Sequence, residues 1–459
     1  MSGFSSLGLG ARALSAAQRG MDVTGQNISN ANTAGYSRQR IDQVAAGGSV
    51  VPALWSRSSN PADGVVITGI TRIRDEFAEA RALSAQGDLS HLSTVKQTYA
   101  DIETTFGEPS DTGLQEQLAG FWTSWHDIAN DPASDAPRAQ MLQKAATLAG
   151  TFNSLSSRMN QQWLDTREQL VATVSNVNAM ASDVARLNAA IRSAVTAGNP
   201  ANELADQRDA LVMQLGQAVG ATATAGPDGV VNVSLGGSPL VSGDRTRALQ
   251  VAGPTNHTPG ASNEMALQWA ADGSAAIGGG SVQGLLDGVD KTLPSYLTQL
   301  DAIAVSVRDA VNGVQRSGYD NGNSGAPSTN DLFAGSGAGD LHVVLTAPKL
   351  VAASSAAPPD ANGDKARQMA ELVGLPGGPD ATYRTLMVSL GVQAQTANRQ
   401  TDLQSAVASQ LEDARTAASG VSLDEEMTNL VNYQHSYEAA AKFITAIDST
   451  LDTLINMTR

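Results

Sequence analysis

Two stripes of apolar side chains, one at each end of the chain, constrain the fold more than any other feature of this sequence. Both recur every three or four residues, the spacing that places side chains on one face of an α-helix. The first stripe consists of Phe4, Leu7, Ala11, Leu14, Gln18, Met21 and Ile28. The second consists of Met427, Leu430, Tyr437, Ala441, Ile444, Leu451 and Ile455. Because such a stripe needs a partner helix, we expect the two terminal helices to pair as a coiled coil.

The charges at the two ends favour the same pairing. Residues 1–74 contain seven arginines against three aspartates, whereas residues 411–459 contain eight carboxylates against three basic residues. Burial of one Leu, Ile or Met contributes about 1.5–3 kcal/mol, while ordering the backbone costs about 1–2 kcal/mol per residue. An isolated two-helix unit would therefore be marginal. On the pattern alone, a monomeric hairpin and a hairpin completed by neighbouring molecules both remain open.

The composition argues against several classes of protein. A chain of 459 residues suggests about three domains. A net charge of −16 argues against a nucleic-acid partner, which would need clustered Lys and Arg. The absence of cysteine excludes disulfides, thiol catalysis and Cys-ligated metals. The sequence contains no run of about twenty apolar residues, which would predict a membrane span. The N-terminus lacks the pattern of a cleaved signal peptide. Export of such a protein would need another route.

The middle of the chain reads as long helices interrupted by one β segment. Helical patterns cover residues 73–105, 114–128, 137–197, 203–219, 282–316, 381–418 and 423–457, after a first helix over 3–28. Short alternating runs that turn on glycines predict strands between 229 and 269, with further strands at 65–68 and 341–345. We therefore predict a mainly α protein with a small β domain, built as an elongated, nested, multi-domain rod.

The nesting predicts how the domains divide. Residues 1–64 and 421–459 form a terminal domain of paired helices, and residues 65–220 and 281–420 form a helical rod domain. Residues 221–280 form an inserted β domain. Since the chain leaves the paired ends and later returns to them, we expect this β domain at the distal end of the rod.

Signatures of catalysis and metal binding are weak. The segment from Asp206 to Asp209 offers opposite charges at short helical spacing, which is more typical of a solvated helix face with weak pairs than of a catalytic site. Asp320 to Asp331 has a faint calcium-loop spacing, but Gly322 stands where a ligand oxygen belongs. The five histidines show no metal spacing, and no nucleophile elbow or phosphate loop is present. We predict no enzymatic activity, no cofactor and no metal site.

Both ends of the chain resemble one family. The opening Gly3-Phe4-Ser5 and the segment 27–39 are similar to the N-terminal signature of flagellar rod, hook and hook-associated proteins. Segments 421–434 and 437–444 resemble the C-terminal signature of the same family. Two long signatures in the right order at opposite ends are specific. In the middle, segments 202–215, 284–312 and 331–333 resemble the junction proteins that stand between hook and filament.

The resemblance implies a structural role in the bacterial flagellum, joining hook to filament. It further implies export through the flagellar type III apparatus, assembly as a ring at the hook tip, and an extracellular location after a transient cytoplasmic stage. The implied partners are further copies of this chain, the hook protein, a second junction protein and a cytoplasmic export chaperone at the C-terminal helix. Neither nucleic acid nor membrane insertion is expected.

The resemblance also assigns an assembly interface. The Asn-rich segment 27–36 could be a plain helix stop, but the family pattern makes it an elbow that contacts adjacent subunits. The predicted interface residues are Leu7, Leu14, Met21, Ile28, Asn30, Asn32, Gly35, Tyr36, Met427, Leu430, Tyr437, Ile444, Leu451 and Ile455.

Three alternatives remain open at this point. A second junction protein, or a hook or rod subunit of the same family, would share the terminal signatures but lack the middle segments. A secreted coiled-coil adhesin would need no matched terminal pair and would have protease-resistant ends. An enzyme within 221–280 has little room, since about sixty residues without Cys or clustered His offer few catalytic groups.

Overall fold

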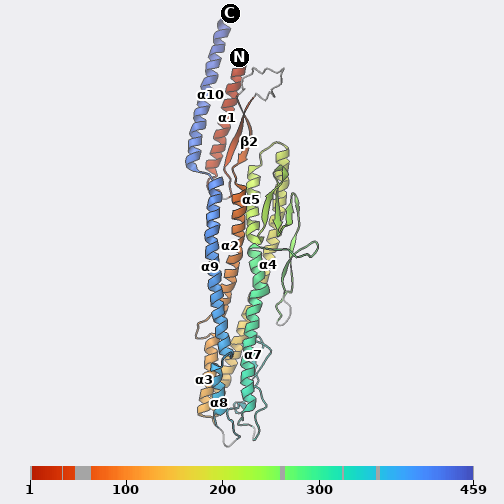
Figure 1. The fold of residues 1–459 in the computed structure, drawn as a ribbon, viewed down its shortest axis with the longest axis vertical. Coiled ribbons are helices and arrows are strands. Elements are labelled where there is room, and N and C mark those ends of the chain that lie inside the picture. Colours follow the sequence, from red (N-terminus) through yellow and green to blue (C-terminus); the bar gives the residue numbers. More distant parts are fainter. Residues whose placement is uncertain are drawn as a thin grey trace.

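Both ends of the chain lie together at one end of an elongated helical rod (Figure 1). The computed structural model describes residues 3–33, 35–46, 64–258, 264–322, 325–357 and 362–457. The helices are α1 (Gly3–Ser29), α2 (Glu76–Phe106), α3 (Leu114–Asn130), α4 (Asp135–Thr196), α5 (Asn202–Val219), α6 (Gly280–Asp287), α7 (Leu293–Ser317), α8 (Asp364–Glu371), α9 (Pro379–Ser419) and α10 (Leu423–Met457), with a π-helical turn, η2 (Gly288–Thr292), between α6 and α7. The prediction of a mainly α, elongated fold with a small β portion is confirmed.

The strands are short. They are β1 (Gln39–Ala45), β2 (Val65–Arg72), β3 (Thr222–Ala225), β4 (Val231–Leu235), β5 (Ser238–Ser242), β6 (Arg245–Thr246), β7 (Leu249–Ala252), β8 (Ala266–Trp269), β9 (Phe333–Ala334) and β10 (His342–Val343). β3 to β6 form one antiparallel sheet in sequence order, and β7 pairs with β8. β1 and β2 pair as a separate antiparallel ribbon beside α1.

The long helices begin and end where local chemistry favours it. The Asp75 side chain accepts hydrogen bonds from the backbone N–H groups of Phe77 and Ala78 at the start of α2. Gly107 ends the same helix with φ +60°, which glycine adopts without strain. α4 is 62 residues long, or about 93 Å at about 1.5 Å per residue. One helix thus runs most of the length of the rod.

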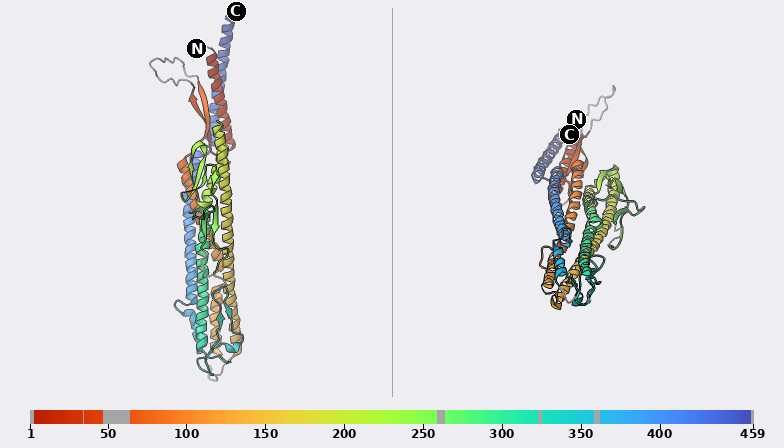
Figure 2. Two further views of the ribbon diagram at one scale, coloured as in Figure 1. Left: turned by 90° about the vertical axis from the view of Figure 1, so that its right-hand side faces the viewer. Right: turned by 60° about the horizontal axis from the view of Figure 1, so that its bottom comes forward.

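The rod consists of two helix pairs that share one core. Seen toward the distal tip, α2 and α9 lie together on one side, and α4 and α7 lie together on the other (Figure 2). Fully buried aromatic side chains belong to this core, including Phe121 and Trp125 of α3 and Phe152 and Trp163 of α4. The Trp163 indole N–H also donates a 2.7 Å hydrogen bond to the carbonyl of Val289 in η2. The burial of these large apolar side chains therefore stabilises the rod.

The β portion does not lie at the distal end, so that prediction is wrong. Its strands pack along the C-terminal half of α4, where the Asn188 amide bonds the carbonyls of Val231 and Gly243 at 2.8 Å. The Asn178 amide likewise bonds the Leu249 carbonyl at 2.8 Å. The reason is the direction of α4, which returns the chain toward the paired ends before the β segment begins (Figure 1).

The distal tip contains α3, α8 and the loops around β9 and β10 (Figure 1). The sequence pattern did not indicate α8, and the predicted strand 341–345 shrinks to the two residues of β10. Asp331, the last residue of the faint calcium-loop spacing, instead forms a two-pronged ion pair with Arg316 at 2.6 and 2.7 Å. Among the described residues, no group of three or more metal-ligating side chains could hold an ion.

Candidate assembly interface

The two terminal helices pair along their length as an antiparallel hairpin. A Cβ atom placed on Gly10 would lie 2.6 Å from Ile444, and one on Gly20 would lie 2.5 Å from the Tyr433 ring. The Asn27 amide donates a 3.0 Å hydrogen bond to the carboxylate of Glu426. From Gly10 to Gly20 to Asn27 of α1, the contacted residue of α10 moves back from Ile444 to Tyr433 to Glu426 by nearly the same number of residues. The antiparallel register is therefore maintained.

Small residues of α1, rather than the predicted stripe, make its closest contact with α10. Gly10, Ala16, Ala17 and Gly20 are buried, and the distances at Gly10 and Gly20 leave no room for a side chain. Ile444 and Tyr433 of α10 fit against Gly10 and Gly20, because the missing Cβ atoms let the two helices approach closely. The sequence pattern predicted the pairing of the helices but not the face that α1 presents.

The predicted interface residues of α1 and α10 are mostly half-buried or exposed. Half-buried positions are Leu7, Leu14, Met21, Ile28, Leu430, Ile444 and Leu451. The more exposed positions are Met427 at 53%, Tyr437 at 36% and Ile455 at 59%. Over the 35 residues of α10, the buried side chains are Glu426 and Ala440. The hairpin therefore leaves much of the predicted apolar surface of α10 in contact with solvent.

The predicted elbow residues lie at the end of α1. The Asn30 amide bonds the Gln26 carbonyl, and its oxygen accepts a bond from the Thr33 hydroxyl. Gly35 takes φ +81°, as expected for the turn, and Asn32 is exposed. Tyr36 is half-buried, and burial together with the nearby carboxylates raises the pKa of its hydroxyl to about 12. Asn30 therefore stabilises the turn, whereas Asn32 and Gly35 face solvent.

A buried polar cluster, missed by the sequence reasoning, joins this elbow to α10. Asn27 accepts 2.9 Å bonds from the Gln39 backbone N–H and the Tyr36 hydroxyl, and its amide donates to the Gln39 carbonyl and to Glu426. Arg38 bonds Glu426 at 2.8 Å and Glu425 at 2.6 Å. Burial lowers the pKa of the Arg38 guanidinium, but the two carboxylates outweigh it and raise the value. The available sequence signal was an asparagine inside the predicted helix 3–28, since its side chain competes with the helix for hydrogen bonds unless it finds other partners.

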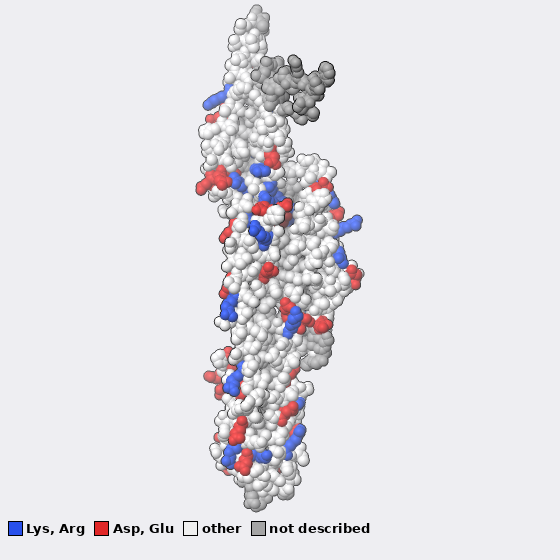
Figure 3. Space-filling view, in the orientation of Figure 1, with Lys and Arg blue, Asp and Glu red and all other residues white. Residues whose placement is uncertain are grey.

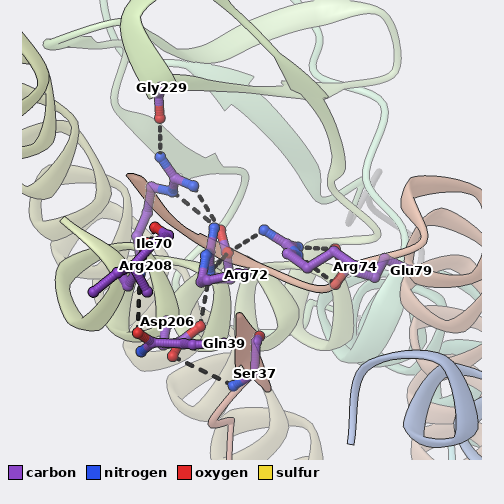
Figure 4. Close-up of polar contacts among 11 residues, drawn as sticks. Ser37, Gln39, Ile70, Arg72, Arg74, Glu79, Asp206, Arg208 and Gly229 are labelled. Carbon is purple, nitrogen blue, oxygen red and sulfur yellow. Dashed lines mark hydrogen bonds and ion pairs between the residues drawn. The ribbon is translucent and has the colours of Figure 1, made fainter. Parts of the chain in front are cut away.

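A second polar cluster joins the β1–β2 ribbon to α5 (Figure 4). The Arg72 guanidinium bonds the carboxylates of Asp206 and Asp209, each at 2.7 Å. Arg74 contacts Asp209 as well, and also pairs with Glu79 of α2. Arg208 bonds Asp209 at 3.0 Å. Burial lowers the pKa of the Arg72 guanidinium, but the two aspartates outweigh it and raise the value.

The second cluster overturns the prediction that the segment from Asp206 to Asp209 is a solvated face. Asp206 is 8% exposed and Arg208 is 2% exposed. The Arg208 guanidinium reaches the carbonyl of Gly229 at 2.6 Å, and Asp206 accepts a bond from the Ser37 backbone N–H. The partners in the terminal ribbon lie 130 or more residues away, so neighbouring sequence could not show them. The cluster links the terminal ribbon, α5, α2 and the β portion.

The two clusters mark a boundary between two kinds of packing. The apolar core cluster of the rod runs from Leu83 to Leu390, and among the described residues it contains none from α1, α10 or the β1–β2 ribbon. On the face drawn in Figure 3, charged side chains gather where the hairpin meets the rod and are few on the hairpin itself. The terminal unit is therefore attached by chain connections and polar contacts. No helix in the described part of the chain is long and apolar enough to cross a membrane.

The ends of the chain match families of flagellar rod proteins. Residues 7–36 match the family described as flagella basal body rod protein. Residues 414–457 match the flagellar basal body rod FlgEFG protein C-terminal family. Together with these two matches, the elongated helical rod with paired ends is that of an axial protein of the bacterial flagellum.

More narrowly, residues 99–333, more than half of the chain, match the family described as flagellar hook-associated protein FlgK helical domain. Flagellar hook-associated protein 1 of Bacillus subtilis is 29% identical, with 97% of this chain and 96% of that protein covered. The protein of the same name from Escherichia coli is 24% identical over 97% of this chain and 98% of that one. The structure of the flagellar hook junction protein FlgK from Burkholderia pseudomallei shares the fold, with a TM-score of 0.63 and 17% identity over 74% of this chain and all of that one.

The chain belongs to the flagellar hook-associated protein 1 (FlgK) family. It is a structural component of the flagellum, at the junction of hook and filament. The predicted family and role are thereby confirmed. The family is one of structural proteins rather than enzymes.

Proposed function

We propose that the chain assembles as a ring at the hook tip, with the terminal hairpin as its conditional interface. The observation that supports the proposal is how few side chains of α10 are buried within the chain. One face of this helix contacts α1, while Leu423, Met427 and Val431 are 50%, 53% and 45% exposed on one flank. Phe443 and Met457, at 41% and 79%, are exposed on the other flank.

A helix with apolar side chains on three sides is typical of a buried helix. In the isolated chain α10 contacts one helix, so neighbouring copies on both flanks would complete its cover. Exposed apolar patches of this kind are typical of interaction sites. The fourteen predicted residues form the interface in this proposal. The buried pair of Asn27 and Glu426 holds the hairpin together beneath it, and the elbow around Tyr36 fixes its angle.

The partners follow from the same surfaces. We propose the hook protein on one side of the ring and a second junction protein on the other. Before export, a cytoplasmic chaperone covers the apolar flanks of α10, since an amphipathic helix is commonly recognised in a groove. The chain then passes unfolded through the flagellar type III apparatus, a step to which the absence of cysteine is suited.

The predicted division into units remains part of the proposal. Residues 1–64 and 421–459 act as the assembly unit, and residues 65–220 and 281–420 form the rod. The inserted unit, 221–280, lies on the side of the rod. The separate apolar core of the rod supports the first boundary.

Replacing both Ile444 and Leu451 with Asp tests the interface. We expect the rod to stay folded by circular dichroism, while hooks lack filaments and the variant is shed into the medium. The physical reason is that two carboxylates on the hairpin face oppose its burial. Normal motility of the variant would rule out this surface as an assembly interface.

A further inference from the structure

Exposed apolar side chains are concentrated in the last part of the chain, and they do not stop at α10. Of the twenty-one large apolar residues that are exposed in the described structure, fourteen lie within 373–457. Four of them follow one face of α9 in the rod: Val388, Val392, Leu403 and Val407, at 67%, 56%, 71% and 47% exposed. We call these four residues the α9 ridge.

The α9 ridge has the composition of an interface rather than of an ordinary solvated helix face. It extends over about 19 residues, or about 28 Å along the rod at about 1.5 Å per residue. From Thr385 to Leu411, the charged residues are Arg399 and Asp402. Depletion of charge around apolar side chains is the compositional mark of an interface core. The opposite face of α9 is already occupied, since it packs on α2.

Arg399 lies in the middle of the ridge, between Val392 and Leu403. Its guanidinium contacts the Thr396 hydroxyl at 3.5 Å, and no ion pair joins it to a carboxylate of the described residues. An arginine on an apolar surface with no ion pair to a carboxylate of its own chain can pair with a carboxylate that a partner supplies. The α9 ridge therefore fits a long, straight partner surface that has a carboxylate near its centre.

This chain carries such a surface on α4. One exposed face of that helix consists of Gln161, Asp165, Glu168, Ala172, Asn176 and Ala179. Val171, 42% exposed, adjoins it. Within the described residues, Glu168 has neither a hydrogen bond nor an ion pair from its carboxylate. Ala172 and Ala179 have small side chains, so the Val and Leu side chains of the α9 ridge can approach this face of α4 closely.

The two faces match in height along the rod. The Thr401 hydroxyl of α9 bonds the Leu92 carbonyl of α2. Lower on α2, Thr98 lies opposite Thr166 of α4, with Gly288 of η2 between them, since a Cβ on Gly288 would be 3.4 and 3.6 Å from the two threonine side chains. Each of these two contacts joins residues at the same height along the rod. With a rise of about 1.5 Å per residue along each helix, positions 399 of α9 and 168 of α4 lie at the same height to within about one helical turn.

The two faces cannot meet within one molecule. α2 and α7 lie between α9 and α4, and each exposed face points away from the core (Figure 2). We propose that the α9 ridge of one copy docks on the exposed α4 face of the next copy, with Arg399 paired to Glu168 across the contact. This inference rests on the proposed ring and names its lateral faces. Because the two faces differ, the contact is heterologous, the kind that closes a ring by repetition.

Cysteine pairing tests the contact directly, because the chain has no cysteine of its own. We introduce Leu403→Cys and Ala172→Cys together, isolate hooks with their filaments, and apply a mild oxidant. A ladder of disulfide-linked multimers is expected, since the two thiols of one molecule are too far apart to pair. Each single variant is the matched control and should stay monomeric. Dimers from Leu403→Cys alone would indicate that α9 faces another α9 and would overturn the proposal.

A charge exchange gives a second measurement. Arg399→Glu and Glu168→Arg should each reduce swimming, and the double variant should restore it. Wild-type swimming of both single variants would overturn the pairing. Filament growth reports the ring separately, so filaments without the disulfide ladder overturn the docking faces and leave the ring. If amine cross-linking of the parent protein in isolated hooks also gives no multimers, the ring itself is wrong.

Discussion

The rod and the terminal hairpin are both made of long helices, yet they are packed in opposite ways. In α4, eighteen side chains are buried, among them Phe152 and Trp163. In α10, the buried side chains are Glu426 and Ala440. The rod thus carries its own apolar core, whereas the hairpin has one helix-to-helix contact and a polar base. The difference supports the proposal that the rod is stable alone, whereas the hairpin is completed by neighbouring molecules.

The largest expected effect lies in the rod. Phe152→Ala should lower the free energy of unfolding by about 3–5 kcal/mol, because it leaves a cavity where the wild-type ring is fully buried. Urea denaturation followed by circular dichroism measures the loss. Leu403→Ala is the matched control: its side chain is 71% exposed, and the change should stay within about 0.5 kcal/mol. Equal losses in the two variants would contradict the existence of a separate rod core.

A smaller effect should appear at the boundary between the two regions. Asp209→Ala removes the carboxylate shared by Arg72, Arg74 and Arg208. Arg72 would keep Asp206 and Arg74 would keep Glu79, but three guanidinium groups would lose their shared carboxylate. Removing one partner from such a largely buried ion cluster should cost about 3 kcal/mol. We expect limited proteolysis to release the terminal segments from this variant first, while the rod fragment persists.

The control for that variant is Asp183→Ala, whose partner Arg186 is largely exposed on α4. Exposed pairs contribute about 0–1 kcal/mol, so its digestion pattern should match the parent protein. If Asp209→Ala is digested no faster than Asp183→Ala, the ion cluster does not hold the hairpin to the rod.

The smallest effect on stability is expected within the hairpin. Met427→Ser should change the unfolding free energy of the isolated chain by no more than about 0.5 kcal/mol, because the side chain is 53% exposed. Swimming in soft agar should nevertheless fall, since the proposed contact with a neighbour loses apolar area. His435→Ser, an exposed polar position of the same helix, should swim normally. A stability loss as large as that of Phe152→Ala would show that α10 is already covered in the monomer.

Helix positions were predictable because their signal is local. The pattern placed one helix over 137–197, and α4 spans Asp135–Thr196. Apolar residues repeated every three or four positions indicate a helix, regardless of where that helix later packs. β1 was missed because its partner, β2, begins only at Val65, and a single strand of seven residues carries little pattern of its own. The location of the β portion was wrong because the direction of α4 is a tertiary property.

The residues of the candidate assembly interface were predictable only in part. The stripes correctly marked α1 and α10 as partners. Asn27 and Glu426, however, are 399 residues apart, and neither side chain is apolar. Polar partners of this kind have no periodicity, so the sequence offers no register for them. The same holds for Arg72 and Asp206, which meet because β2 and α5 are brought together.

By itself, the sequence determined that the chain forms long helices, that its ends pair and that it belongs among axial flagellar proteins. These conclusions rest on local periodicity and on signatures read directly from neighbouring residues. The tertiary structure decided which face of α1 meets α10, where the β portion lies and which charged groups are buried. Each of those outcomes depends on contacts between segments far apart in the chain, and such contacts exist only once the long helices have been placed beside one another.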